Sequence, residues 1–196
     1  ASIALITLAV AVNAFANALA LATALVYAVL AYGYSFLRKH WWSHFIVSAA
    51  TTAPVVYGYA LAGAPADKLW FTALYAATIF LATTGREVVK AVMDLEGDKA
   101  YGYVTLPVKY GVEAARKAIL AHAFAAPVAG ILAGVIGGVS ILYHALMLVA
   151  SAIYNYSMLE AYKHVSDKAV LEKARKRALA AMAVGLLAFL LSRTRF

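Results

Sequence analysis

The chain has no cysteine, which excludes disulfide bonds, thiolate metal sites and cysteine nucleophiles. Charged residues are also scarce, because they make up 13% of the 196 residues, whereas soluble domains usually contain about 25%. Carboxylates are the rarest charged groups: nine Asp and Glu stand against 17 Lys and Arg, and none precedes Asp67. This composition excludes an ordinary water-soluble domain.

Hydrophobic residues dominate instead, at 65% of the chain and a mean hydropathy of +0.80. One crossing of a bilayer takes about 20 mostly apolar residues, so the length allows about seven crossings with short connections. We therefore expect an all-α, multi-pass transmembrane helical bundle, an integral membrane protein in which residues 1–196 form a single domain.

The apolar runs predict membrane helices at residues 16–34, 45–62, 69–84, 115–136, 139–159 and 178–191. The first 34 residues are too long for one span, since they would form a helix of about 50 Å. We expect a polar break at Asn13 and Asn17, with the end of another helix before it. On this interpretation the chain begins in mid-helix and further residues precede it in the native protein.

Positive charge falls on one side of the predicted bundle. All but three of the 17 Lys and Arg lie in or beside residues 38–44, 86–117 and 163–177, the exceptions being Lys68, Arg193 and Arg195. Because basic loops tend to stay in the cytoplasm, we expect these segments to be cytoplasmic. The net charge of +8 then indicates no nucleic-acid partner.

Four of the nine acidic residues lie between Glu87 and Asp98. If the helix starting near residue 69 continues through them, Glu87, Lys90, Asp94 and Asp98 fall within about 80° of one face, and Glu96 faces away. Two carboxylates one turn apart suit a hard ion such as Mg²⁺, which also takes water and phosphate oxygens. The alternative is a solvated loop whose charges only keep the helix end in water.

Tyr34 and Arg38 form a second candidate pair, one turn apart at the end of a predicted span, where they could address one anion. We interpret Lys39, Trp41 and Trp42 as an interfacial belt. Polar residues within later spans could line a cavity or form hydrogen bonds between helices. They are His122, Tyr143, His144, Tyr154, Asn155 and Tyr156.

The stretch REVVKAVMDLEGD followed by GYVTLPVKYG resembles the second aspartate-rich motif of the UbiA superfamily of intramembrane prenyltransferases. Tyr34-x-x-x-Arg38 is similar to the family's Tyr-x-x-x-Lys/Arg element two spans earlier, and the order of loops and spans agrees. The motif is most similar to that of archaeal members that alkylate geranylgeranylglyceryl phosphate. The resemblance implies the later two-thirds of a nine-helix fold.

The resemblance implies Mg²⁺-dependent transfer of a prenyl group from an isoprenyl diphosphate, such as the geranylgeranyl compound, to an acceptor within the membrane. The acceptor would be geranylgeranylglyceryl phosphate or an aromatic compound such as 4-hydroxybenzoate. The implied roles are Mg²⁺ binding for the catalytic Asp94 and Asp98, and substrate binding for Lys90, Arg38, Tyr34, Arg86 and Ser35.

Two departures from the family pattern qualify this expectation. The first aspartate-rich motif, Asn-Asp-x-x-Asp, does not occur in the 196 residues, and Ala91 stands where archaeal members often carry a further aspartate. We therefore expect these residues alone to be inactive. One alternative is a transporter or channel, whose charges usually lie at mid-membrane. The other is a purely structural membrane protein, which would not explain why Lys90, Asp94 and Asp98 share one helix face.

Overall fold

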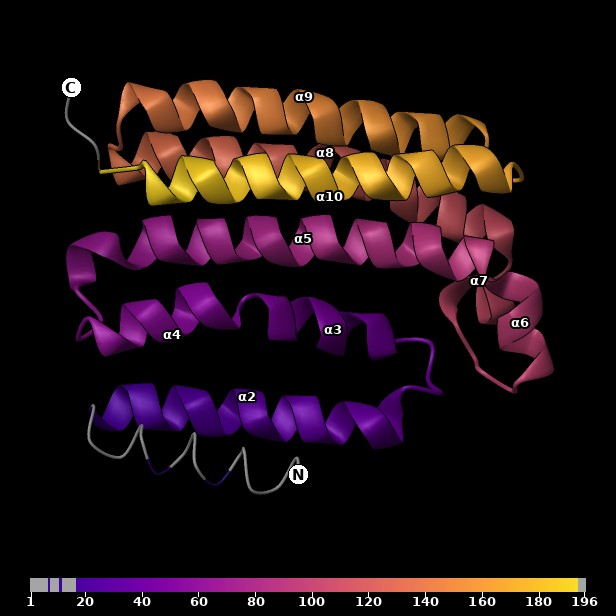
Figure 1. Ribbon diagram of the computed structural model, residues 1–196, viewed down its shortest axis with the longest axis horizontal. Coiled ribbons are helices and arrows are strands. Elements are labelled where there is room, and N and C mark those ends of the chain that lie inside the picture. Colours follow the sequence, from indigo (N-terminus) through magenta and orange to yellow (C-terminus); the bar gives the residue numbers. More distant parts are fainter. Residues whose placement is uncertain (1–6, 8–10, 12–16, 194–196) are drawn as a thin grey trace.

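The computed structural model describes residues 7, 11 and 17–193, and every element of residues 17–193 is a helix (Figure 1). The long helices are α2 (Ala18–Leu37), α5 (Leu69–Met93), α8 (Val112–Gly137), α9 (Ile141–Lys163) and α10 (Lys168–Leu190). The shorter ones are α3 (Ser43–Thr51), α4 (Ala53–Leu61), the 3₁₀ turn η1 (Ala66–Lys68), α6 (Leu95–Ala100) and α7 (Leu106–Tyr110).

The helices run side by side along one long axis (Figure 1). α5 packs against α8, and α9 packs against α8 and α10, so these four form a bundle. The α3–α4 pair lies along the other side of α5, and α2 packs outside that pair. α6 and α7 extend beyond the end of α5. The chain is thus an all-α helical bundle, as predicted.

All six predicted spans within the described residues are helical, whereas the partial helix before residue 16, with Asn13, lies outside them. α2, α8 and α9 are long and apolar enough to cross a membrane. α5 and α10 extend past the apolar runs into charged sequence. Asn17 is the predicted break: its side chain accepts a hydrogen bond from the Ala20 N–H at 2.8 Å and caps α2.

The predicted span at residues 45–62 differs from the structure, because it consists of two short helices that meet at Thr52. Pro54 lies in the first turn of α4, where its missing N–H is tolerated but the preceding helix cannot continue undisturbed. The Thr52 hydroxyl donates to the Ala49 carbonyl at 2.7 Å and lies 2.6 Å from the Tyr27 hydroxyl of α2. These contacts satisfy polar groups at the break.

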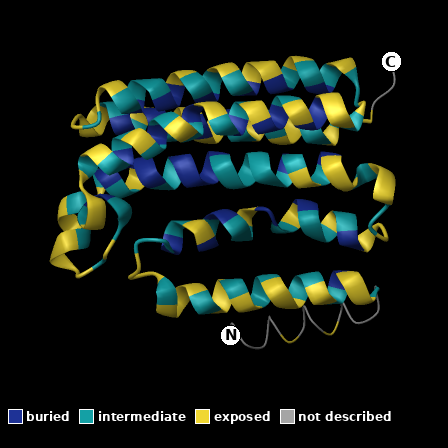
Figure 2. Ribbon diagram, turned by 180° about the vertical axis from the view of Figure 1, so that it is seen from behind, coloured by how far each residue is buried: buried dark blue, intermediate teal, exposed yellow. Residues whose placement is uncertain are grey.

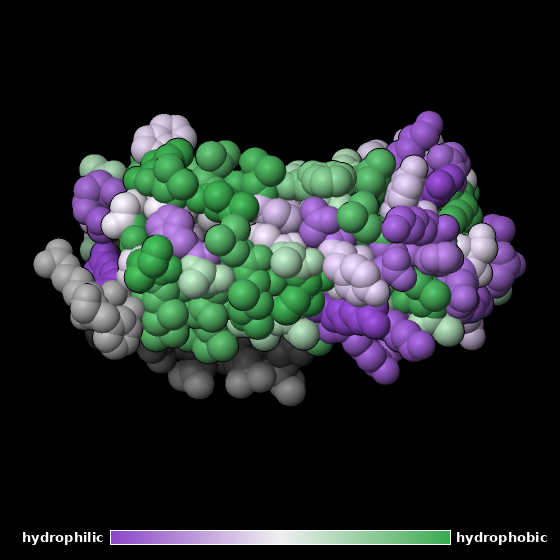
Figure 3. Space-filling view, turned by 90° about the horizontal axis from the view of Figure 1, so that it is seen from above, coloured by the Kyte–Doolittle hydropathy of each residue, from purple (hydrophilic) through white to green (hydrophobic). Residues whose placement is uncertain are grey.

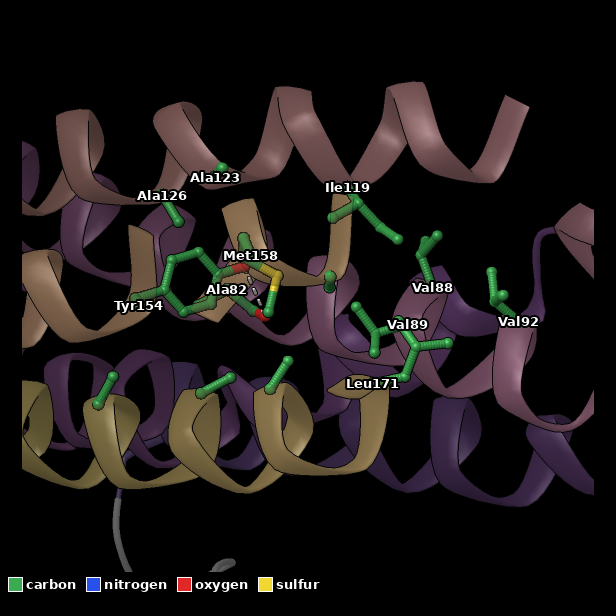
Figure 4. Close-up of a cluster of buried hydrophobic side chains, with 14 of the residues drawn as sticks. Ala82, Val88, Val89, Val92, Ile119, Ala123, Ala126, Tyr154, Met158 and Leu171 are labelled. Carbon is green, nitrogen blue, oxygen red and sulfur yellow. Dashed lines mark hydrogen bonds between the residues drawn. The ribbon is translucent and has the colours of Figure 1, made fainter. Parts of the chain in front are cut away.

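Buried side chains gather where α5, α8, α9 and α10 meet, while α2 is mostly exposed (Figure 2). One buried cluster includes Val88 and Val89 of α5, Ile119 of α8, Met158 of α9 and Leu171 of α10 (Figure 4). Its many alanines let the helices approach closely, which suits packing in lipid. The Tyr154 hydroxyl donates to the Ala82 carbonyl at 3.1 Å and links α9 to α5 (Figure 4).

Glycines on α8 permit its contact with α9. A Cβ at Gly134 would lie 2.5 Å from Cε1 of Tyr143, and one at Gly130 would lie 2.7 Å from Sδ of Met147. Tyr143 is fully buried there, with its hydroxyl donating to the Gly130 carbonyl at 2.8 Å. Gly58 of α4, by contrast, has open space around it.

We expect Gly134→Ala to lower the free energy of unfolding by about 1–3 kcal/mol, because the new methyl group displaces the buried Tyr143 ring. Gly58→Ala is the matched control, since it adds the same methyl group to an uncrowded helix and should be neutral or stabilising by up to about 1 kcal/mol. Thermal unfolding in detergent measures both. Equal unfolding temperatures would contradict the close α8–α9 contact.

Candidate active site

The acidic segment lies at the end of α5, where polar residues gather at one end of the molecule (Figure 3). α5 ends at Met93, Asp94 caps it, and α6 follows directly. The Asp98 N–H donates to the Asp94 carbonyl at 2.8 Å, so one helical turn separates the two carboxylates despite the change of helix. Glu96 is exposed and pairs with Lys99, on the side away from this face, as predicted.

A cavity of about 250 Å³ collects the predicted face and the second candidate pair. We call it the polar cavity. It is lined by Tyr34, Arg38, Trp41, Ser43, His44, Val47, Glu87, Val88, Lys90, Ala91, Asp94, Asp98, Tyr103, Thr105 and Leu106. Residues from α2, α3, α5 and α6, distant in sequence, thus share one site.

Two contacts join the segments that border the polar cavity. The Val104 N–H donates to the Lys39 carbonyl at 2.9 Å and joins the segment after α6 to the segment after α2. The Arg38 guanidinium carbon lies 5.7 Å from the centre of the Tyr103 ring, a cation–π contact. Together they hold the end of α2 against the segment after α6.

Asp94 and Asp98 form no ion pair with any residue that the structure describes. Burial raises the pKa of Asp98, and the nearby Asp94 carboxylate raises it further. The buried Thr105 hydroxyl favours the ionised form of Asp98, although it makes no hydrogen bond of standard geometry. Two neighbouring carboxylates without an ion pair among the described residues are a donor set that fits a divalent cation.

Two residues proposed for substrate binding lie outside the lining. Ser35 is exposed on α2 and does not line the polar cavity. Arg86 does not line it either, because its Nη1 donates to Oε1 of Glu87 at 2.7 Å, and its Nε is buried without a partner among the described residues. Within those residues, no group of three or more His, Asp or Glu is placed to hold a metal ion.

The structure adds lining residues that the sequence did not point to, mainly His44, Tyr103 and Thr105. Trp41, which was predicted to belong to an interfacial belt, also lines the cavity and packs against Tyr110 with ring centres 5.4 Å apart. Tyr103 and Thr105 follow the acidic segment closely in the sequence, and this position could have indicated that they line the cavity. For His44 no signal existed, since its place depends on how α3 packs against α5.

The polar residues of the later spans mainly join helices. Asn155 donates to the Ala123 carbonyl at 3.3 Å, and Tyr156 is exposed beside Arg177. His144 bonds within its own helix, to the Ser140 carbonyl. Of the six, Tyr154 lines a second cavity, of about 450 Å³, between the helices. This apolar cavity is lined by residues such as Thr51, Val55, Tyr75, Met147, Tyr154 and Met182.

Residues 1–182 match the UbiA prenyltransferase family. The chain belongs to that family. It is 33% identical over 178 residues to the digeranylgeranylglyceryl phosphate synthase of Methanopyrus kandleri, an alignment covering 90% of this chain and 63% of the relative. It is 29% identical over 146 residues to the enzyme of the same name from Thermococcus sibiricus, covering 74% of this chain and 50% of the relative.

A solved structure described as digeranylgeranylglyceryl phosphate synthase in membranes matches with a TM-score of 0.77 and 26% sequence identity. The match covers 96% of this chain and 66% of that chain. The chain therefore shares the UbiA family fold over nearly its whole length, while spanning less than two-thirds of the first relative.

Within this UbiA family site, we expect Glu87→Gln to lower the free energy of unfolding by about 1–3 kcal/mol, because it leaves the largely buried Arg86 guanidinium without its carboxylate. Glu96→Gln is the control: its pair with Lys99 is exposed, so its loss should cost less than about 0.5 kcal/mol. Thermal unfolding compares the two variants. A smaller effect at Glu87 than at Glu96 would contradict a structural role for the inner pair.

Proposed function

We propose that the protein transfers a prenyl group from an isoprenyl diphosphate to an acceptor within the membrane. The observation that carries this proposal is the polar cavity, which brings Asp94 and Asp98 together with Lys90 and Arg38. The carboxylates can bind a metal cation, and the Lys and Arg side chains can bind an anion. A cavity that contains both suits a substrate with a metal-bound diphosphate. Membership of the UbiA prenyltransferase family supports the same reaction.

In this proposal Asp94 and Asp98 hold Mg²⁺, since they supply hard oxygens one turn apart and have no ion-pair partner among the described residues. The bound Mg²⁺ supplies positive charge that makes the diphosphate a better leaving group. Lys90 and Arg38, from α5 and the end of α2, bind diphosphate oxygens from different sides. Tyr34 donates a hydrogen bond from the same lining.

Arg86 and Ser35 have weaker support as substrate-binding residues, because neither lines the polar cavity. The bond between Arg86 and Glu87 points to a different contribution: it fixes the Glu87 carboxylate at the cavity wall. Diphosphate binding therefore rests mainly on Lys90 and Arg38 in our proposal. Ser35 lies on the exposed end of α2 and has no assigned role in our proposal.

The prenyl chain lies in the apolar cavity in our proposal. Val47 lines the polar cavity and Thr51 lines the apolar one, so the two cavities follow one another along a single turn of α3. A diphosphate held among charged residues would thus continue into a space without charged side chains among its lining residues. Such a space also shields an allylic cation from water.

We assign the acceptor to the glyceryl phosphate class, since two relatives are named digeranylgeranylglyceryl phosphate synthase. The basic loops and the polar cavity face the cytoplasm in this proposal, which follows the distribution of Lys and Arg. A transporter or channel is less well supported, because the charged groups gather at one end of the bundle and not at mid-membrane (Figure 3).

Asp94→Asn and Asp98→Asn should each abolish Mg²⁺-dependent release of diphosphate from geranylgeranyl diphosphate, because one carboxylate cannot hold the ion in place. The complete native protein in lipid is used, with released diphosphate as the readout. Glu96→Gln is the matched control, an exposed carboxylate of the same segment, and should keep full activity. EDTA should abolish diphosphate release by the unmodified protein. Full activity of both aspartate variants would refute the metal assignment.

The acceptor assignment has its own test. With the same protein and geranylgeranyl diphosphate, geranylgeranylglyceryl phosphate should be alkylated and 4-hydroxybenzoate should not. The lipid product and the aromatic product are separated by chromatography. Prenylation of the aromatic acceptor alone would reverse the assignment while leaving prenyl transfer intact.

A further inference from the structure

His44 lines the polar cavity but has no part in holding the cation or the diphosphate. It lies in the first turn of α3, directly before the apolar run at residues 45–62, and its side chain is half-buried. The backbone carbonyl of Trp41 lies near the ring and favours its protonated form. A neutral imidazole has one ring nitrogen with a free lone pair, whichever nitrogen carries the proton.

The surroundings of His44 favour a neutral ring. Burial lowers its pKa, and the nearby His122 of α8 lowers it further, although the Trp41 carbonyl acts in the opposite direction. The other ionisable or charged groups that share the cavity are Tyr34 and Arg38 of α2, Glu87, Lys90 and Asp94 of α5, Asp98 of α6 and Tyr103. A neutral imidazole among them can accept a proton at physiological pH.

The other groups of the cavity are poorly suited to this task. Asp94 and Asp98 are assigned to the cation, and the Glu87 carboxylate is engaged by Arg86 at 2.7 Å. Tyrosine and lysine side chains carry their own proton near neutral pH, as does arginine. Among the described lining residues, His44 is the remaining base.

Prenyl transfer to a hydroxyl acceptor releases one proton, which needs a destination. We propose that His44 is the general base of the transfer, an inference that rests on the proposed function. The acceptor oxygen forms a bond to C1 of the prenyl group, the bond from C1 to the diphosphate oxygen breaks with its electron pair, and the acceptor proton moves to the free ring nitrogen of His44. The ring returns the proton to water at the mouth of the cavity.

Gly85 allows His122 to come near His44. A Cβ at Gly85 would lie 2.9 Å from Cβ of His122 and would also meet the Tyr154 hydroxyl, so no larger residue fits between α5 and α8 there. Nδ1 of His122 lies 2.7 Å from the Ala118 carbonyl. His122 is thus a positioning residue that influences the protonation of His44 through electrostatics, without lining the cavity.

The test measures kcat and KM for geranylgeranyl diphosphate against pH, with the complete native protein in lipid. His44→Asn should lower kcat about 10²–10⁴-fold, leave KM within about twofold, and remove the acidic limb of the kcat profile. His40→Asn is the matched control, since His40 stacks on Trp42 and does not line the cavity. It should leave kcat, KM and the acidic limb unchanged.

His122→Asn keeps His44 and provides a second measurement. Loss of the neighbouring imidazole raises the pKa of His44, so the acidic limb should move to higher pH. An unchanged kcat in His44→Asn, or a reduced kcat with its acidic limb still present, would overturn the proposal. So would a kcat profile of the unmodified protein that is flat between about pH 5 and pH 8. An unmodified protein that releases no diphosphate would instead refute the proposed function itself.

Discussion

One backbone hydrogen bond, from the Asp98 N–H to the Asp94 carbonyl at 2.8 Å, maintains the geometry of the candidate site. Without it, the change from α5 to α6 at Asp94 would let the second carboxylate turn away from the first. With it, helical spacing continues through the junction, and the face that begins at Glu87 reaches Asp98. The spacing of Asp94 and Asp98 on that face therefore follows from the direction of α5.

The direction of α5 is set deep inside the bundle. Val88 and Val89 are almost fully buried against α8, α9 and α10, one to two turns from Asp94. On its other side, the Thr84 hydroxyl donates to that of Ser48 at 2.8 Å, and the Thr51 and Thr83 hydroxyls lie 3.1 Å apart. Since a hydrogen bond between helices has no competing water in an apolar interior, these contacts fix α3 against α5. The packing of the core thereby places both His44 and Asp94.

These dependencies explain what the sequence could predict. Helical periodicity was sufficient to group Glu87, Lys90, Asp94 and Asp98, because all four lie on a nearly continuous helix and only local geometry is involved. The apolar runs were sufficient to predict helices, since lipid requires a helix wherever the chain crosses it, and among the described residues α2, α8 and α9 are long and apolar enough to cross a membrane. Pro54 could have predicted the break in the second span, because proline cannot continue a helix from the turn before it.

Tertiary contacts determine the rest of the site. Tyr103 and Thr105 enter the polar cavity because the Val104 N–H reaches the Lys39 carbonyl, a contact between segments that no local pattern encodes. Arg86 and Glu87 are adjacent in sequence, yet only the packing shows that they pair and that Glu87, not Arg86, lines the cavity. Trp41 was predicted to lie at the membrane interface from its residue type, and only the packing shows that it also lines the cavity.

The break between α3 and α4 links the two cavities to the rest of the fold. A straight helix over residues 45–62 would continue the path of α3, but the turn at Thr52 gives α4 its own contact with α2 and α5. Pro54 and Val55, just beyond the turn, line the apolar cavity, while Val47 lines the polar one. One predicted span thus contributes to two chemically different spaces. A diphosphate with a long hydrocarbon chain needs both, because its charged and apolar ends cannot share one environment.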